Sequence, residues 1–133
     1  MSGCVLRVSG STAKVRTFLA ESKLRPIRVF LRGEVDFPSR GPNKKSGFNV
    51  PLPSSGEGAI LLRQSISVAN FINRHRREFE RLTKFGFASP VLDFALNDLA
   101  TQERPWPTYH LSPKLIAVAG EFGLAIELSF YGK

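Results

Sequence analysis

The chain has 133 residues, of which 42% are hydrophobic and 11% aromatic, enough to bury a core and to argue against intrinsic disorder. One cysteine and two histidines exclude an intramolecular disulfide and the usual four-ligand Cys/His zinc site. No apolar run is long enough to span a bilayer, and no signal-peptide pattern is found. We therefore expect one cytoplasmic domain over residues 1–133, with no membrane contact, metal or cofactor.

The net charge is +8, from 19 Lys and Arg against 11 Asp and Glu, and it is unevenly distributed. Residues 1–85 carry a balance of +10, whereas residues 86–133 carry −2. Such a basic region suits nucleic acid, anionic lipid or an acidic protein surface. Charge alone therefore does not identify a partner.

The first segments predict a strand, a helix and a second strand. Residues 4–9 form a β-rich run, and apolar side chains then recur at helical spacing from Val15 to Leu19. Residues 27–32 alternate in polarity, as expected of a strand with two different faces. One face carries Ile27, Val29 and Leu31, and the other carries Arg28, Phe30 and Arg32.

The next segments predict a loop and a third strand. Residues 36–47 are rich in Pro and Gly and predict a mobile loop. Residues 48–53 alternate again, but Pro51 and Pro53 cannot donate ladder hydrogen bonds, so an edge strand is expected.

The remaining segments predict two helices and two strands. Residues 59–84 have the longest helical pattern, with His75 in a gap of an apolar stripe formed by Leu61, Leu62, Ile66, Ala69, Ile72, Phe79 and Leu82. Residues 91–96 predict a strand, and a long polar loop covers 97–110. Ser112-Pro113 begins a short apolar helix, and residues 125–131 alternate as a last strand.

The first six elements follow the ferredoxin-like βαββαβ order, and a helix and a strand extend it. This order predicts an α+β two-layer sandwich. Its sheet would be mixed or mainly antiparallel, with about five strands and the helices on one face.

The uncovered face of such a sheet is a candidate interaction surface. The alternation of side chains along the strands places the protein-binding candidates on this face: Arg28, Phe30, Arg32, Glu127 and Tyr131. Cross-strand pairing of Arg with Asp or Glu is the ordinary alternative explanation. Binding of a partner or of a second copy is the functional one.

Two basic segments are candidates for nucleic-acid binding. They supply Lys44 and Lys45 from the loop, and Arg74, Arg77, Arg81 and Lys84 at three- and four-residue steps of one helix. A solvated helix face, partly paired with Glu78 and Glu80, is the usual explanation for the second set.

The loop before the last helix is a candidate pocket wall, with Trp106, Tyr109 and His110. No nucleophile elbow accompanies His110, and no spacing ties it to a carboxylate, so no catalytic residue is predicted. Cys4 fits a small buried hydrophobe.

Three stretches of the chain resemble a known kind of family: Leu24-x-Pro26 leading to Arg32-Gly33-Glu34, the segment 111–116, and the aromatic-ended segment 122–132. The resemblance is to small bacterial α+β domains of unknown function that begin with a strand and end in an apolar helix and a strand. Some members have been proposed as immunity proteins that neutralise partner toxins, which implies a protein partner.

Three functions follow, in order of preference. The first is a non-enzymatic protein that binds a macromolecule, namely another protein or a second copy of itself. The second is nucleic-acid binding through the basic segments. The third is a small enzyme using the loop from Trp106 to His110.

Overall fold

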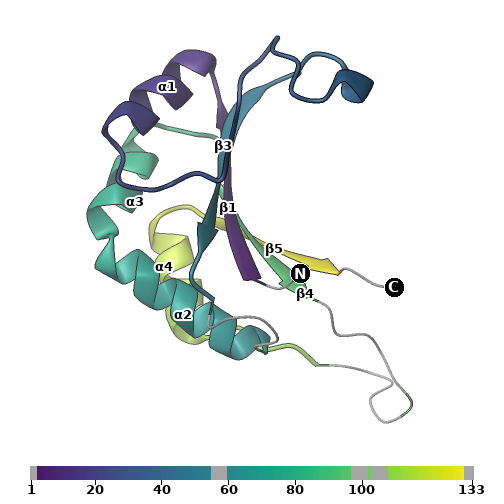
Figure 1. Cartoon of the computed structure of the whole chain (residues 1–133). Coiled ribbons are helices and arrows are strands. Elements are labelled where there is room, and N and C mark those ends of the chain that lie inside the picture. Colours follow the sequence, from purple (N-terminus) through teal and green to yellow (C-terminus); the bar gives the residue numbers. More distant parts are fainter. Residues whose placement is uncertain (1–2, 55–59, 97–101, 103–107, 131–133) are drawn as a thin grey trace.

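The computed structural model describes residues 3–54, 60–96, 102 and 108–130, which form five strands and four α-helices (Figure 1). In chain order these are β1 (Gly3–Gly10), α1 (Thr12–Glu21), β2 (Arg28–Phe30), β3 (Ser46–Leu52), α2 (Leu61–Arg74), α3 (Arg76–Lys84), β4 (Val91–Leu96), α4 (Pro113–Glu121) and β5 (Ala125–Phe130). A 3-10 turn at Pro38–Arg40 lies between β2 and β3.

All five strands form one sheet in the order β2-β3-β1-β4-β5. The pairs β2–β3, β3–β1 and β1–β4 are antiparallel, whereas β4–β5 is parallel. The first four strands have the arrangement of a split βαβ fold, and α4 is the crossover that adds β5 beside β4. The predicted fold, a ferredoxin-like core with a helix and strand added, is confirmed.

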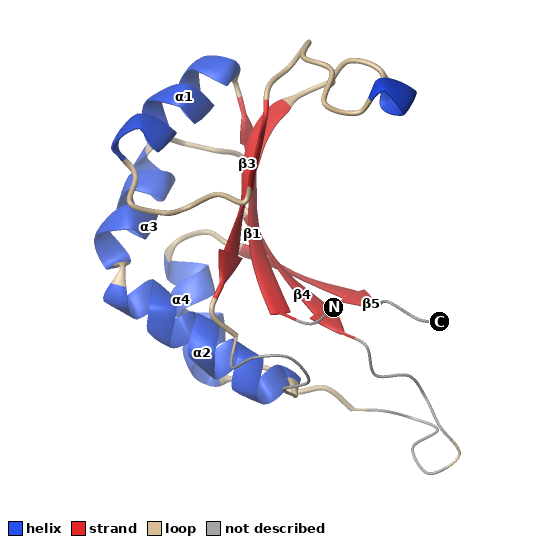
Figure 2. Cartoon of the chain, in the orientation of Figure 1, coloured by secondary structure: helices blue, strands red, loops and turns tan. Residues whose placement is uncertain are grey.

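The four α-helices all lie on one face of the sheet, as predicted (Figure 2). Alternate strand residues point into the layer between sheet and helices, where Leu6, Phe48 and Leu92 are fully buried. Phe18 of α1 stacks on Phe48 of β3 with ring centroids 5.5 Å apart, so α1 is fixed above β3. The opposite face receives no α-helix in the described part of the chain, and only the loop with the short 3-10 turn extends on that side.

A buried carboxylate holds the connection from α1 to β2. Glu78 of α3 accepts hydrogen bonds from Ser22 Oγ (2.6 Å) and from the Lys23 backbone N–H (2.9 Å). Burial alone would raise the pKa of Glu78. Those hydrogen bonds and nearby Arg81 outweigh it, so the pKa lies below the ordinary value. Glu78 therefore sets where the chain enters the edge strand.

The predicted helix over 59–84 is two helices rather than one. His75 has φ −115° and ψ 35°, which ends α2 and lets α3 begin in a new direction. The break does not change which side of the segment is buried, since Leu61, Val68, Ala69, Ile72, Phe79 and Leu82 are all buried at helical spacing. Leu62 and Ile66 of the predicted stripe are exposed, and Gln64 and Ser65 are buried instead.

The strands also differ from prediction at one edge. β2 has only three residues, and Val29 is 43% exposed because α1 packs on β3 and β1 rather than on β2. β3 is an inner strand, not the predicted edge, since it pairs with both β2 and β1. Pro51 is tolerated there because β2 pairs only with residues 47–49, which leaves Pro51 with one neighbouring strand.

Among the described residues, none of the helices combines the length and the apolar character that a membrane span requires.

Candidate functional site

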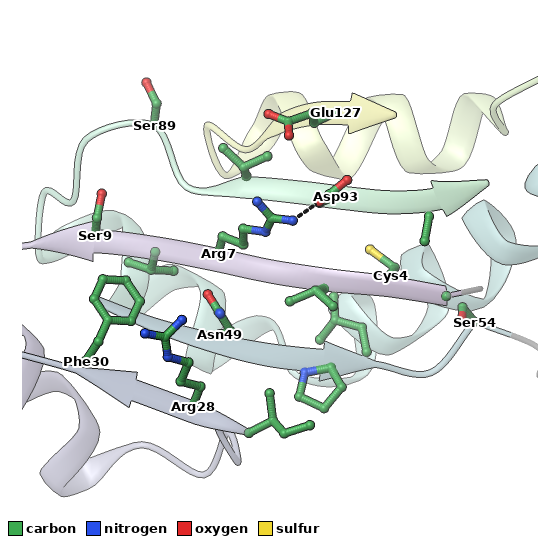
Figure 3. Close-up of a pocket in the computed structure, with 18 of the residues that line it drawn as sticks. Cys4, Arg7, Ser9, Arg28, Phe30, Asn49, Ser54, Ser89, Asp93 and Glu127 are labelled. Atoms are coloured by element: carbon green, nitrogen blue, oxygen red, sulfur yellow. Dashed lines mark hydrogen bonds and ion pairs between the residues drawn. The ribbon is translucent and has the colours of Figure 1, made fainter. Parts of the chain in front are cut away.

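The open face of the sheet holds a trough of about 790 Å³ (Figure 3). Its lining comes from all five strands and includes Val5, Arg7, Arg28, Asn49, Asp93 and Glu127. These residues reach the open face because side chains alternate along each strand while their neighbours enter the core. The alternation of side chains along the strands thus determines both which residues enter the core and which line the trough.

An ion pair occupies the middle of the trough. Arg7 of β1 contacts the carboxylate of Asp93 on the adjacent β4, and Ser129 Oγ of β5 donates a hydrogen bond to the other carboxylate oxygen (2.6 Å). Asp93 is 4% exposed, whereas the Arg7 side chain is 48% exposed. The charge of Asp93 is therefore satisfied within the protein, which is the cross-strand pairing expected from the sequence.

A stack of cations and rings forms the β2 end of the trough. The Arg28 guanidinium carbon lies 5.1 Å from the Phe30 ring centroid and 4.9 Å from that of Phe37. Arg40 covers Phe37 at 5.2 Å. Asp36 lies 3.6 Å from Arg28 Nη2, too far for a strong hydrogen bond. Two aromatic rings, rather than a close carboxylate, thus orient Arg28.

The loop that carries this stack is tied to itself. The Asn43 side-chain amide donates to the Leu31 carbonyl (3.1 Å) and to Asp36 Oδ2 (2.8 Å). Backbone hydrogen bonds also join Gly33 to Asn43 and Asn43 to Glu34. These bonds fold the predicted mobile loop back on itself beside β2.

A glycine on β3 lets Phe30 lie flat across the sheet. A Cβ added at Gly47 would stand 2.6 Å from the Phe30 ring and 2.3 Å from the Val8 carbonyl oxygen. Any larger residue at this position would displace the ring, and with it the partner of Arg28.

A second, smaller pocket of about 260 Å³ adjoins the trough at the same end. It is lined by Arg28, Phe30, Asn43, Lys44 and Lys45, a set that contains three cations and no carboxylate. Within the described part of the chain, neither lysine makes an ion pair. We call Arg28, Lys44 and Lys45 the basic pocket.

The opposite side of the trough carries negative charge. Glu127 of β5 is exposed on the open face, beside Asp93 in the sheet register. Between the two sides lie small or apolar residues, including Val5, Pro51 and Val91. The trough is therefore positive at β2, neutral in the middle and negative at β5.

The structure brings together only part of each predicted set. Arg28, Phe30 and Glu127 line the trough as expected, and Lys45 of the nucleic-acid set joins them. Arg32 lies past the end of β2, where its backbone N–H donates to Ser46 Oγ (2.8 Å). Tyr131 lies outside the described residues.

The predicted basic helix face lies in the other layer of the fold. Arg74, Arg77, Arg81 and Lys84 belong to α2 and α3, and the loop with Lys44 and Lys45 extends on the open side of the sheet (Figure 1). Arg81 packs over the Phe18 ring at 4.9 Å and lies 3.8 Å from both Glu21 and Glu78. The two basic segments therefore do not join into one patch.

The third predicted site is only partly described. Tyr109 packs against Phe130 with ring centroids 5.6 Å apart, and His110 is exposed. Trp106 lies outside the described residues. Cys4 is 2% exposed, and burial, with a smaller effect of Asp93, raises its pKa so that the thiol stays protonated. Over the described ranges, no three His, Cys, Asp or Glu side chains gather as metal ligands.

Sequence reasoning missed the contributions of Phe37 and Asn43. Phe37 is an aromatic residue in an otherwise polar loop, and this was the signal available in the sequence. The structure shows that its side chain is 45% exposed. Asn43 carried no comparable signal, because its two hydrogen bonds depend on the folded loop.

Comparison of the chain with protein-family models, with curated proteins and with solved structures found no match.

Proposed function

We propose that this chain is a non-enzymatic protein that binds a polypeptide partner on the open face of its sheet. The observation that carries the proposal is the trough, because helices cover one face of the sheet and the other offers apolar and charged side chains to another molecule. We expect it to act in the cytoplasm. The family resemblance adds that the partner is a toxin.

The charge distribution favours a polypeptide over nucleic acid at this face. A polyanion laid across the trough would meet the exposed carboxylate of Glu127 as well as the cations of the basic pocket. A polypeptide carries both charges and apolar side chains, so it complements a face with the same mixture.

The experiment is selection from a displayed library of random peptides on the purified protein. Peptides that bind the open face should lose binding to the variant Val91→Lys, which places a long cation on the trough floor. They should keep binding to Ile66→Lys, a matched change on the exposed side of α2.

Circular dichroism and thermal melting of both variants serve as the folding control. The proposal fails if the library gives no specific binder, or if the recovered peptides bind Val91→Lys as tightly as they bind the unaltered protein.

A further inference from the structure

We propose that the basic pocket binds a carboxylate of the partner polypeptide, and that a basic side chain of the same segment lies against Glu127. This inference rests on the proposed function, since it specifies the chemistry of the partner at that face. The segment would cross the strands rather than run along them, acidic at the β2 end and basic at the β5 end.

The first step is the availability of the cations in the basic pocket. Arg28 is held between the Phe30 and Phe37 rings, yet it donates no hydrogen bond to any residue that the structure describes. Its guanidinium N–H groups are thus oriented and free to bind a carboxylate. Lys44 and Lys45 add two further charges at the wall of the same pocket.

The second step is that the carboxylate of Asp36, which would compete with a partner for Arg28, binds it only weakly. Asp36 is the one carboxylate that reaches Arg28 among the described residues, at 3.6 Å, and its oxygen already accepts a hydrogen bond from Asn43. A partner carboxylate at normal hydrogen-bond distance would therefore add contacts rather than replace good ones.

The third step is the opposite charge on the far strand. Glu127 is exposed and has no cation within ion-pair distance in the described part of the chain. Four strand spacings separate β2 from β5, about 19 Å, which an extended segment of about six residues spans.

The fourth step concerns the floor between the two charges. Asp93 pairs with Arg7 and accepts a hydrogen bond from Ser129, so the middle of the trough presents paired charge with Val5 and Val91 around it. An apolar stretch between the charged ends of the segment fits this floor. A nucleic-acid strand would instead carry a phosphate there and at Glu127.

The experiment extends the display selection to charge-altered proteins. A library of peptides about twice the length of the trough is selected separately on the unaltered protein, on Lys44→Glu/Lys45→Glu and on Glu127→Lys. The unaltered protein should enrich Asp and Glu at one end of the peptides and Lys and Arg at the other. Peptides selected on Lys44→Glu/Lys45→Glu should no longer be enriched in Asp and Glu at one end. Peptides selected on Glu127→Lys should no longer be enriched in Lys and Arg at the other end.

Affinities of a single peptide from the first selection give the quantitative result. Each charge reversal should weaken its binding by about tenfold. The matched control Arg74→Glu/Lys84→Glu changes two exposed cations on the helix layer and should leave the affinity within about twofold. Lys44→Ala/Lys45→Ala provides a milder version of the first reversal.

Three outcomes would overturn the inference. Specific peptides without charge preference would leave the proposed function standing and remove the inference alone. An absence of any binder would remove both. Tight binding of oligothymidylate that weakens steeply with salt and requires Lys44 and Lys45 would assign the basic pocket to nucleic acid.

Discussion

Two arginines in this protein stack on phenylalanine rings in the same way but lie in different surroundings. Arg81 on α3 and Arg28 on β2 each lie over two phenylalanine rings at about the same distances, 4.9 and 5.5 Å for Arg81 against 5.1 and 4.9 Å for Arg28. They differ in what surrounds the rings. One ring under Arg81 is Phe18 of the core, whereas Phe37 beside Arg28 lies at the surface.

The carboxylates near the two arginines reinforce the difference. Arg81 has Glu21 and Glu78 within 3.8 Å, and Arg28 has Asp36 at 3.6 Å, shared with Asn43. A cation stacked on core rings and balanced by carboxylates stabilises the fold. A cation stacked on surface rings, with a single nearby carboxylate that already accepts a hydrogen bond from Asn43, is available to a partner. The environment of the rings, rather than the contact itself, separates the two roles.

The strongest test of this comparison removes one ring from each site. Phe18→Ala should lower the free energy of unfolding by about 4 kcal/mol, because it leaves a cavity beneath α1. Phe37→Ala should lower it by less than about 1 kcal/mol, since the ring is surface-exposed. Urea denaturation measures both, and similar losses would show that the Arg28 stack is part of the core.

The carboxylate near Arg81 gives a test that depends on pH. Glu78→Gln should lower the free energy of unfolding by about 2 kcal/mol near neutral pH, because charged hydrogen bonds to Ser22 and Lys23 are weakened. The folded pKa of Glu78 lies below the ordinary value of 4.5, so its stabilisation is complete above that pH.

That stabilisation is lost as the pH falls through the folded pKa. The difference between Glu78→Gln and the unaltered protein should therefore narrow in acid, as followed by urea denaturation across a series of pH values. A difference that stays constant down to acid pH would show that Glu78 acts only through packing.

The smallest expected effect comes from the two arginines themselves. Arg81→Ala should cost about 1 kcal/mol of unfolding free energy, through the lost stacking and ion pairs. Arg28→Ala should cost less than about 0.5 kcal/mol. Thermal melting of both variants measures the difference, and an equal cost would make Arg28 a structural residue and weaken its assignment to binding.

Hydrophobic periodicity predicts most of the fold, because core burial imposes it on the sequence. It places all five strands and the crossover helix, and the element order leads to the observed sheet. It does not locate the break at His75, since the helical pattern continues on both sides of a single non-helical residue. It also does not show that α1 leaves β2 uncovered, because this depends on how the helices are positioned over the sheet.

The candidate site was predictable where it lies on strands and unpredictable where it lies on the loop. The alternation of side chains along the strands places Arg28, Phe30 and Glu127 on one face, independently of the loop conformations. The basic pocket needs Lys44 and Lys45 to fold back against β2, which depends on long-range hydrogen bonds of Asn43. Glu78 lies one residue from buried Phe79, but its hydrogen-bond donors lie on a distant segment.

The parallel strand β5 has a consequence for how the protein is made. The four antiparallel strands pair with one another, whereas β5 pairs only with β4 and brings Glu127 to the face and Ser129 to Asp93. A chain emerges from the ribosome from its N-terminus, so the positive side of the trough is synthesised first and the negative side last. A partner that requires both charges is therefore excluded from the nascent chain until β5 has emerged and paired.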